Sequence, residues 1–236
     1  MAEIIKLSEI SKIYKMGGEV VNALDGVDVG IEKGDFVAIM GPSGSGKSTM
    51  MNMVGALDKA SKGSIFLEGF DIKKLDESQL AQIRGKKIGF IFQGFNLVPN
   101  LTAKENIALP MLFQDEEKEQ RESKAEKLLE MVDLKDRGEH YPNQLSGGQQ
   151  QRVAIARALA NDPEVILADE PTGNLDTKTG KMVLDFLENL NKKGKTIIMV
   201  THDSDLAKEY AKTIYWIKDG KIDSKTRKKG ERWISF

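Results

Sequence analysis

A glycine-rich segment carries the clearest chemistry in this sequence, because it matches the phosphate-binding pattern G-x-x-x-x-G-K-[ST]. Its residues are Gly41, Pro42, Ser43, Gly44, Ser45, Gly46, Lys47, Ser48 and Thr49. Glycines lack a Cβ atom, so the backbone can aim successive N–H groups at an anion. The Lys47 ammonium suits the β- and γ-phosphates of a nucleotide, and the Ser48 hydroxyl suits Mg²⁺. The segment therefore predicts a nucleotide site; the alternative is a glycine-rich turn that matches by chance.

Polar side chains also stand at the ends of three apolar runs that are typical of buried parallel strands. They are Gln93 after 88–92, Asp169 and Glu170 after 165–168, and His202 after 196–201. Ligand groups collect at the carboxyl ends of parallel strands. There Asp169 would hold Mg²⁺, Glu170 would orient an attacking water, Gln93 would reach Mg²⁺ or a water, and His202 would contact the γ-phosphate. The alternatives are a surface glutamine, two exposed acids and a structural histidine.

A second glycine-flanked helix start lies at 145–149, where Ser146 is a natural N-cap. Gly147 and Gly148 allow close backbone approach, and Gln149 precedes a helix that we expect from 150 to 160. Such a start is an anion site, although in isolation it is usually only a cap. One chain needs one phosphate cradle, so the surplus helix start requires an explanation.

Composition narrows the class of protein. The 236 residues carry 35 Lys and Arg against 36 Asp and Glu, a net charge of −1, so the whole molecule has no field that attracts nucleic acid or anionic lipid. Cysteine is absent, which excludes disulfides and suits a reducing cytosol. No apolar run approaches the ~20 residues that span a bilayer, and the start lacks the features of a signal peptide. We expect a soluble protein whose membrane role comes through a partner.

Periodicity predicts an α/β fold that begins with an antiparallel pair. An edge strand is expected from Ile4 to Lys15, then a hairpin turn at 15–19 and a returning strand at 20–29. Tyr14 stands near the end of the first strand, where its ring would stack on an adenine or pack as an ordinary strand tyrosine. The run 36–40 predicts a buried strand before the glycine-rich segment, and 49–55 predicts a helix after it.

The segment 96–142 has no strand signal and interrupts the alternation of strands and helices. A helix that is expected to end at Pro110 is followed by an amphipathic one over 115–133. The apolar stripe of this second helix is Ala125, Leu128, Leu129 and Val132. Further on, a helix over 177–191 is expected to bury Met182, Val183, Phe186, Leu187 and Leu190. The basic tail 221–236 is expected to be a solvated end, with contact to a membrane surface as the alternative.

Taken together, these motifs resemble the ATP-binding-cassette ATPase family over nearly the whole chain. The matches are 41–49 to Walker A, Gln93 to the Q-loop, 145–149 to the signature motif, Asp169 to Walker B, Glu170 to the catalytic glutamate, 174–176 to the D-loop, His202 to the switch histidine and Tyr14 to the adenine-stacking aromatic. The resemblance implies a P-loop NTPase with a mainly parallel core sheet, an N-terminal antiparallel β-subdomain and an inserted α-helical subdomain. It places the core in 1–94 and 161–236, and the helical subdomain in 95–160.

The resemblance also accounts for the surplus helix start. In this family two cassettes pack head to tail, and the signature motif of one, here Ser146, Gly147, Gly148 and Gln149, caps the γ-phosphate of ATP held by the other. Lys47 and the loop would bind ATP, while Ser48, Gln93 and Asp169 would manage Mg²⁺. Glu170 and His202 would serve the hydrolysis step.

Within the family, the segments 93–97, 145–158 and 169–176 look like the branch of lipoprotein release, macrolide export and the cell-division regulator FtsE. That implies permease partners of the FtsX/MacB type, no nucleic acid, and a place at the inner face of the membrane. Gly94 and the Gly173-Asn174 pair depart mildly from the common pattern. Alternatives are a soluble cassette acting on ribosomes or DNA, an FtsE-like regulator, or a GTPase or kinase, although the guanine-reading motif has only a near miss at 191–194.

Overall fold

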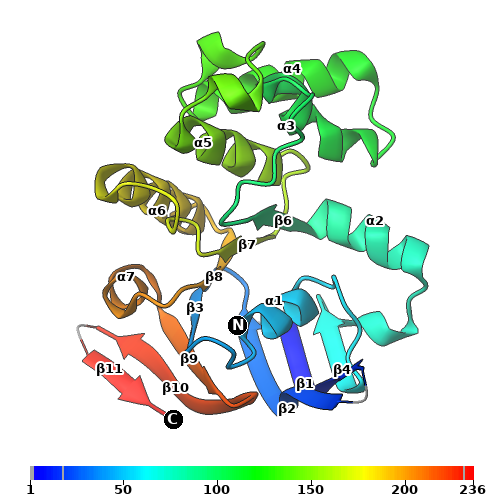
Figure 1. Ribbon diagram of the computed structural model, residues 1–236, viewed down its shortest axis with the longest axis vertical. Helices are drawn as coiled ribbons and strands as arrows, with labels where there is room; N and C mark the ends of the chain where they lie inside the picture. The colour runs from blue at the N-terminus through cyan, green and yellow to red at the C-terminus, as the bar shows by residue number, and fades with distance from the viewer. Residues whose placement is uncertain (1–2, 18, 231) are drawn as a thin grey trace. The chain divides into compact units, whose positions relative to one another are not determined.

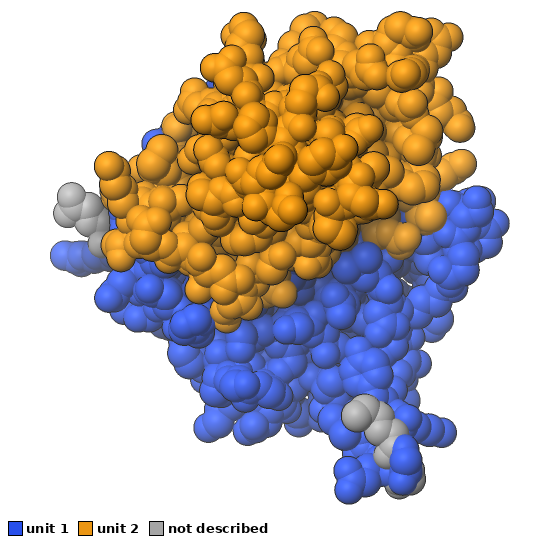
Figure 2. All heavy atoms as spheres, turned by 45° about the horizontal axis from the view of Figure 1, so that its top comes forward, with its two compact units in different colours: residues 1–80, 190–236 blue, residues 81–189 orange. Residues whose placement is uncertain are grey.

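The computed structural model describes residues 3–17, 19–230 and 232–236 (Figure 1). The chain divides into two compact units, which Figure 2 shows in different colours. The first unit contains residues 1–80 and 190–236, and the second contains residues 81–189. The helices α2 (Glu77–Lys87) and α6 (Thr177–Lys192) include the two points at which the chain passes from one unit to the other.

The first unit contains an antiparallel sheet in the order β2-β1-β4-β5. Its strands are β1 (Glu3–Met16), β2 (Glu19–Glu32), β4 (Lys62–Leu67) and β5 (Phe70–Asp71), and β5 leads into the short helix η1 (Ile72–Lys74). The expected antiparallel pair is confirmed, although Gly18 in the predicted turn lies outside the described residues. The expectation that the first strand is an edge was wrong, because β1 has β2 on one side and β4 on the other.

A second sheet in the first unit is built around β3 (Phe36–Met40), which is buried along its whole length. β3 pairs in parallel with β8 (Thr196–Val200) and β9 (Thr213–Lys218). The antiparallel strands β10 (Lys221–Lys229) and β11 (Arg232–Ser235) continue it beyond β9. β3 and β8 are continuous apolar runs, and such runs are typical of strands that are buried on both faces of a sheet.

Two helices pack on these strands. Helix α1 (Lys47–Val54) buries Met50, Met51, Met53 and Val54 and contacts β1, β2 and β8. Helix α7 (Ser204–Tyr210) contacts β3 (Figure 1), and its Tyr210 ring lies 6.5 Å from that of Phe36. The glycine-rich segment is therefore the direct link between a fully buried strand and a helix with a buried apolar face.

The basic tail forms two strands of this sheet, β10 and β11, and none of its described residues is buried, as we expected of a solvated end. The Arg227 guanidinium donates two hydrogen bonds to the Glu32 carboxylate, at 3.3 and 2.8 Å, and lies 3.8 Å from Asp35. The Lys225 ammonium lies 5.2 Å from the centre of the Tyr215 ring. Charged residues of the tail therefore have partners elsewhere in the first unit. The sequence pattern alone does not reveal these partners.

The second unit pairs β6 (Ile88–Ile91) in parallel with β7 (Val165–Asp169) and adds several helices. These are α3 (Ala103–Leu112), α4 (Lys118–Met131), η2 (Lys135–Arg137), η3 (Pro142–Gln144) and α5 (Gly147–Ala158). With parallel strands in both units, an antiparallel β-subdomain and a helical segment in the middle of the chain, the predicted α/β P-loop NTPase fold is confirmed. The second compact unit, residues 81–189, contains β6 and β7 as well as the helices. A separate helical subdomain at 95–160 therefore stays a proposal.

The three long helices of this unit share one apolar core. Ala125, Leu129 and Val132 of the predicted stripe are buried, and Leu128 packs partly against the same core. The expectation that a helix ends at Pro110 was wrong, because α3 continues to Leu112 and buries Met111 fully. A capping box at Thr102 and Glu105 fixes the start of α3. Every helix in the described part of the chain is too short or too polar to cross a bilayer.

One part of the predicted core is wrong. Met182 of α6 is 50% exposed, whereas Leu184 is fully buried in its place. Val183, Leu187 and Leu190 are buried as expected, and Phe186 is half-buried. The apolar stripe of α6 is therefore rotated toward Leu184, a shift that the run of neighbouring apolar residues in the sequence leaves undetermined.

Replacing Arg227 with methionine should lower the free energy of unfolding by about 1 kcal/mol at neutral pH, since the partly exposed guanidinium holds two carboxylates. Its hydrogen bonds lower the pKa of Glu32, while burial raises the pKa of Asp35 and Arg227 opposes that rise. A lowered carboxyl pKa stabilises the fold above the ordinary pKa and loses that effect as the pH falls. Urea unfolding should therefore show a smaller difference between wild type and Arg227→Met near pH 4 than near pH 7. Arg232→Met, at an exposed arginine of β11, is the control, and a difference that did not change with pH would contradict this assignment.

Candidate functional site

The glycine-rich loop between β3 and α1 has a backbone that only glycine can adopt at two positions. Gly41 and Gly46 have φ angles of +153° and +105°. A Cβ atom on Gly41 would collide with the carbonyl oxygen of Ile217, and one on Gly46 would lie 2.5 Å from the carbonyl oxygen of Ala23. The loop is therefore pressed against the backbone of β9 and of β2.

The interior of this loop has the features of an anion site. The Lys47 ammonium donates to the carbonyl oxygens of Gly41, at 2.8 Å, and Pro42, at 2.7 Å, and so folds back over the loop. Ser45 is 3% exposed, and its hydroxyl oxygen has no hydrogen-bond partner among the described residues. An orphaned hydroxyl in a glycine cradle beside a lysine fits the oxygens of a phosphate group.

The start of α1 completes this arrangement. Its N-cap is Gly46, no side chain caps its first turn, and that turn contains no acidic residue. The unsatisfied N–H groups and the positive end of the helix dipole therefore favour an anion. The Ser48 hydroxyl, the predicted Mg²⁺ ligand, belongs to an exposed residue in this first turn.

Tyr14 lies in the same unit, in a cluster with Lys12 and Asp58. Its hydroxyl donates to Asp58 Oδ2 at 3.0 Å, and the Lys12 ammonium lies 5.0 Å from the ring centre and 2.6 Å from Asp58 Oδ1. Burial and then the bond to Asp58 raise the pKa of Tyr14, while a hydrogen bond with the Thr49 side chain lowers it. This last contact joins Tyr14 to the end of the glycine-rich loop, and the ring is only half-buried.

His202 is the second residue after β8, the neighbour of β3. The preceding Thr201 is buried, and its N–H donates to the carbonyl oxygen of Ile39 at 3.2 Å. The following Asp203 caps α7, because its Oδ1 accepts from the N–H groups of Asp205 and Leu206. His202 is therefore an exposed residue between two fixed neighbours, at the carboxyl end of a buried strand.

The acidic pair lies in the second unit, at the end of β7. Asp169 and Glu170 are both half-buried, and Glu170 adopts a left-handed backbone with φ +42°. The carbonyl oxygen of the next residue, Pro171, accepts a hydrogen bond from Gln151 Nε2 at 2.8 Å, and Gln151 is fully buried in α5. The turn that presents the two carboxylates is thus fixed to the helix that begins at the signature motif.

The segment 145–149 begins α5 with a complete capping box. Ser146 Oγ accepts from the N–H of Gln149 at 3.4 Å, and Gln149 Oε1 accepts from the N–H of Ser146 at 2.9 Å. A Cβ on Gly148 would lie 2.6 Å from Thr179 Cγ2, so this glycine permits close packing of α5 on α6. Ser146 itself is exposed. The two predicted anion sites therefore differ: α1 has no side-chain cap, whereas α5 caps itself and presents its start outward.

Gln93 follows β6 and is exposed in a turn. Its carbonyl oxygen accepts from Asn174 Nδ2 at 2.8 Å. Within the second unit the structure thus brings Gln93, the segment after Glu170 and the start of α5 together. The sequence analysis assigned no role to the half-buried Arg157, which binds this turn; the available signal was a charged residue between the apolar faces of α5.

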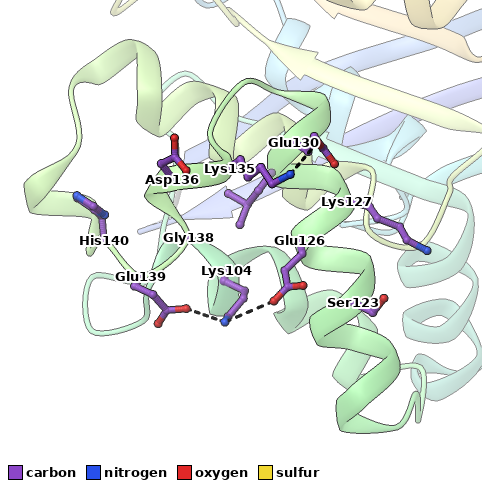
Figure 3. Close-up of a pocket in the computed structure, with 11 residues that line it drawn as sticks. Lys104, Ser123, Glu126, Lys127, Glu130, Lys135, Asp136, Gly138, Glu139 and His140 are labelled. Carbon is purple, nitrogen blue, oxygen red and sulfur yellow. Dashed lines mark hydrogen bonds and ion pairs between the residues drawn. The ribbon is translucent and has the colours of Figure 1, made fainter.

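A separate hollow of about 520 Å³ lies on the helices of the second unit (Figure 3). Its charged groups pair with one another: the Lys104 ammonium lies 2.6 Å from Glu139 and 3.9 Å from Glu126, and Lys135 lies 3.0 Å from Glu130. His140, the other histidine of the chain, is at its edge and contacts Arg137 at 3.2 Å. None of the residues with predicted phosphate chemistry lines this hollow.

Comparison with known proteins agrees with these motifs. Residues 24–173 match the family model described as ABC transporter. The uncharacterized ABC transporter ATP-binding protein MJ0796 of Methanocaldococcus jannaschii is 50% identical over 232 residues, 96% of this chain and 98% of that protein. The macrolide export ATP-binding/permease protein MacB of Aggregatibacter actinomycetemcomitans is 50% identical over 96% of this chain, but only 35% of that protein is matched. A solved dimeric structure of MJ0796 bound to ADP and Pi superposes with a TM-score of 0.89 and 48% identity, covering 96% of this chain and 99% of that one.

Two glycines of the loop offer a matched test of its packing. Gly44 and Gly46 both have positive φ angles, +74° and +105°, but a Cβ on Gly44 meets nothing within 4 Å. Gly46→Ala should therefore lower the free energy of unfolding by about 3 kcal/mol, from backbone strain and the clash with Ala23. Gly44→Ala should cost only about 1 kcal/mol, from strain alone. Chemical denaturation measures both, and equal losses would mean that the loop is not pressed against β2.

Proposed function

This chain belongs to the ATP-binding cassettes of ABC transporters, which are ATPases, and on that basis we propose how it uses ATP. Two copies bind two nucleotides head to tail, so that each ATP lies between the glycine-rich loop of one copy and the signature motif of the other. ATP stabilises the closed dimer because it binds both halves, and hydrolysis removes the shared anion.

The contrast between the two helix starts is the observation that carries this proposal. The start of α1 is uncapped and lies beside Lys47 and an orphaned hydroxyl, as a phosphate site requires. The capping box of α5 satisfies the N–H groups of Ser146 and Gln149, yet it leaves Ser146 exposed, with the half-buried Gly147 and Gly148 beside it. A surface of that kind suits the γ-phosphate of a nucleotide held by another copy. The relative MJ0796, solved as a dimer with ADP and Pi, supports this interpretation.

We assign the binding roles by chemistry. Lys47 and the amides of 41–49 bind the phosphates, and the Tyr14 ring packs against the adenine. Ser48, Gln93 and Asp169 offer a hydroxyl, an amide and a carboxylate, the oxygen donors that suit a hard divalent cation. When bound, Mg²⁺ would neutralise negative charge on the β- and γ-phosphates.

Two residues serve the hydrolysis step. Glu170 accepts a proton from the attacking water, since a carboxylate is a suitable base and its turn is fixed by the bond from Gln151 to Pro171. His202 contacts the γ-phosphate from the end of β8. Each copy thus supplies its loop, base and histidine to one nucleotide, and its Ser146, Gly147, Gly148 and Gln149 to the nucleotide of its partner.

We also propose that the dimer drives an integral-membrane permease of the FtsX/MacB type from the inner face of the cell membrane. The likeness to a macrolide export ATP-binding/permease protein supports this, because there a matching cassette is part of a chain that also contains the permease. The permease would select the substrate. The segment 95–160, with its apolar core and the signature motif, would form the helical subdomain that transmits closure.

Replacing Glu170 with glutamine should abolish turnover, by at least about 100-fold, without preventing ATP binding, because only the proton acceptor is lost. ATP should then hold the variant as a dimer, which size-exclusion chromatography or sedimentation detects. Glu119→Gln, at an exposed position of α4, is the control and should behave as wild type. A Glu170→Gln protein that stays monomeric with ATP and retains normal turnover would refute the assignment.

A further inference from the structure

The turn that carries Gln93 has an unfavourable backbone. After β6, the N–H of Phe95 donates to the carbonyl oxygen of Phe92 at 3.1 Å, and that of Asn96 donates to Gly94 at 2.6 Å. Phe95 and Asn96 have φ angles of +60° and +50°. Consecutive side-chain-bearing residues in the left-handed region are disfavoured, so contacts from elsewhere must hold this turn.

The first of these contacts comes from a neighbouring helix. Arg157 of α5 donates from Nη2 to the carbonyl oxygen of Phe95 at 2.8 Å and from Nη1 to that of Asn96. Arg157 is half-buried, and burial lowers the pKa of its guanidinium. A guanidinium with two donors on carbonyl oxygens is a fixed anchor, because its planar fork holds both acceptors in one geometry.

The second contact lies at the surface and reaches Gln93 itself. Asn174 Nδ2 donates to the Gln93 carbonyl oxygen at 2.8 Å, and both residues are exposed. A Cβ on Gly173 would lie 2.7 Å from Gln93 Nε2, so the amide side chain rests against that glycine. Gly173 is in turn bonded through its N–H to the carbonyl oxygen of Glu170 at 3.0 Å. A short path therefore leads from Glu170 through Gly173 and Asn174 to Gln93.

The start of α5 borders the same place. A Cβ on Gly147 would lie 3.8 Å from the Phe95 ring and 4.0 Å from the Asn174 carbonyl oxygen. The turn of Gln93, the segment after Glu170 and the signature helix thus meet within one unit. A shift at any of them bears on the tie between Asn174 and Gln93, because that tie is one exposed hydrogen bond, whereas Arg157 holds the turn through two.

We propose that Asn174 is a positioning residue, whose side-chain amide holds the Gln93 turn to the segment following Glu170 and so couples the Mg²⁺-binding group to the base. This inference rests on the proposed function, because it needs Gln93 to act at Mg²⁺ and Glu170 to act on water. An exposed neutral hydrogen bond suits this role, because it can break and form again as the dimer closes and opens.

Asn174→Ala removes the donor, and Asn174→Asp replaces it with an acceptor of nearly the same shape. Both should lower kcat about fivefold, the effect of one neutral hydrogen bond, and leave the KM for ATP within about twofold. The Mg²⁺ concentration for half-maximal turnover should rise. Asn100→Ala, at another exposed loop asparagine of the same unit, should match wild type.

A double-mutant cycle with Gln93→Ala decides whether Asn174 acts through Gln93. If it does, Asn174→Ala should have little further effect on turnover once Gln93 is alanine, because interacting residues are not additive. Fully additive losses, or kcat and Mg²⁺ dependence equal to wild type, would overturn the inference. Trapping of the Glu170→Gln dimer by ATP is measured in parallel: if it persists, only the role of Asn174 fails, and if it is absent, the proposed function fails first.

Discussion

The structure depends on one constraint: a multiply charged phosphate chain must be held largely by backbone N–H groups, which only a particular loop conformation can aim. Gly41 and Gly46 supply that conformation, but the loop is also fixed from outside by the backbone of Ile217 and Ala23. A buried strand, β3, between β8 and β9 holds one end of the loop, and the apolar face of α1 holds the other. The packing of the sheet and of α1 therefore sets the conformation of the loop and the direction of its amides.

The second unit must instead hold polar groups that stay at least partly exposed. The acidic pair, Gln93 and the signature motif lie in turns, and each turn is fixed by a side chain from a neighbouring element or from its own helix. Gln151 and Arg157, both on α5, bind the backbone after β7 and after β6. One helix therefore connects all three turns, and under the proposed function a contact at its exposed start would bear on the other two.

Much of this could be predicted from sequence, for reasons that are local. Continuous apolar runs identify buried strands such as β3 and β8, and the motifs identify the candidate site because phosphate chemistry requires those residues at that spacing. What failed was long-range. β1 is not an edge, because β4 pairs with it, and the basic tail forms strands that pair with β9 and with each other. The tie from Asn174 to Gln93 joins residues far apart in the chain, and no periodicity predicts it.

The central claim is that one copy of the chain holds only half of each working pocket, and complementation between two inactive variants tests it most directly. Lys47→Ala removes the lysine of the glycine-rich loop but leaves the signature motif intact. Ser146→Arg disrupts the signature motif but leaves the loop intact. Mixed copies can then build one complete pocket per heterodimer, so ATPase activity should return to about a quarter of wild type, since half of the dimers are mixed and each has one of two sites. A mixture no more active than its separate components, with both variants folded, would contradict the claim that the pocket is shared.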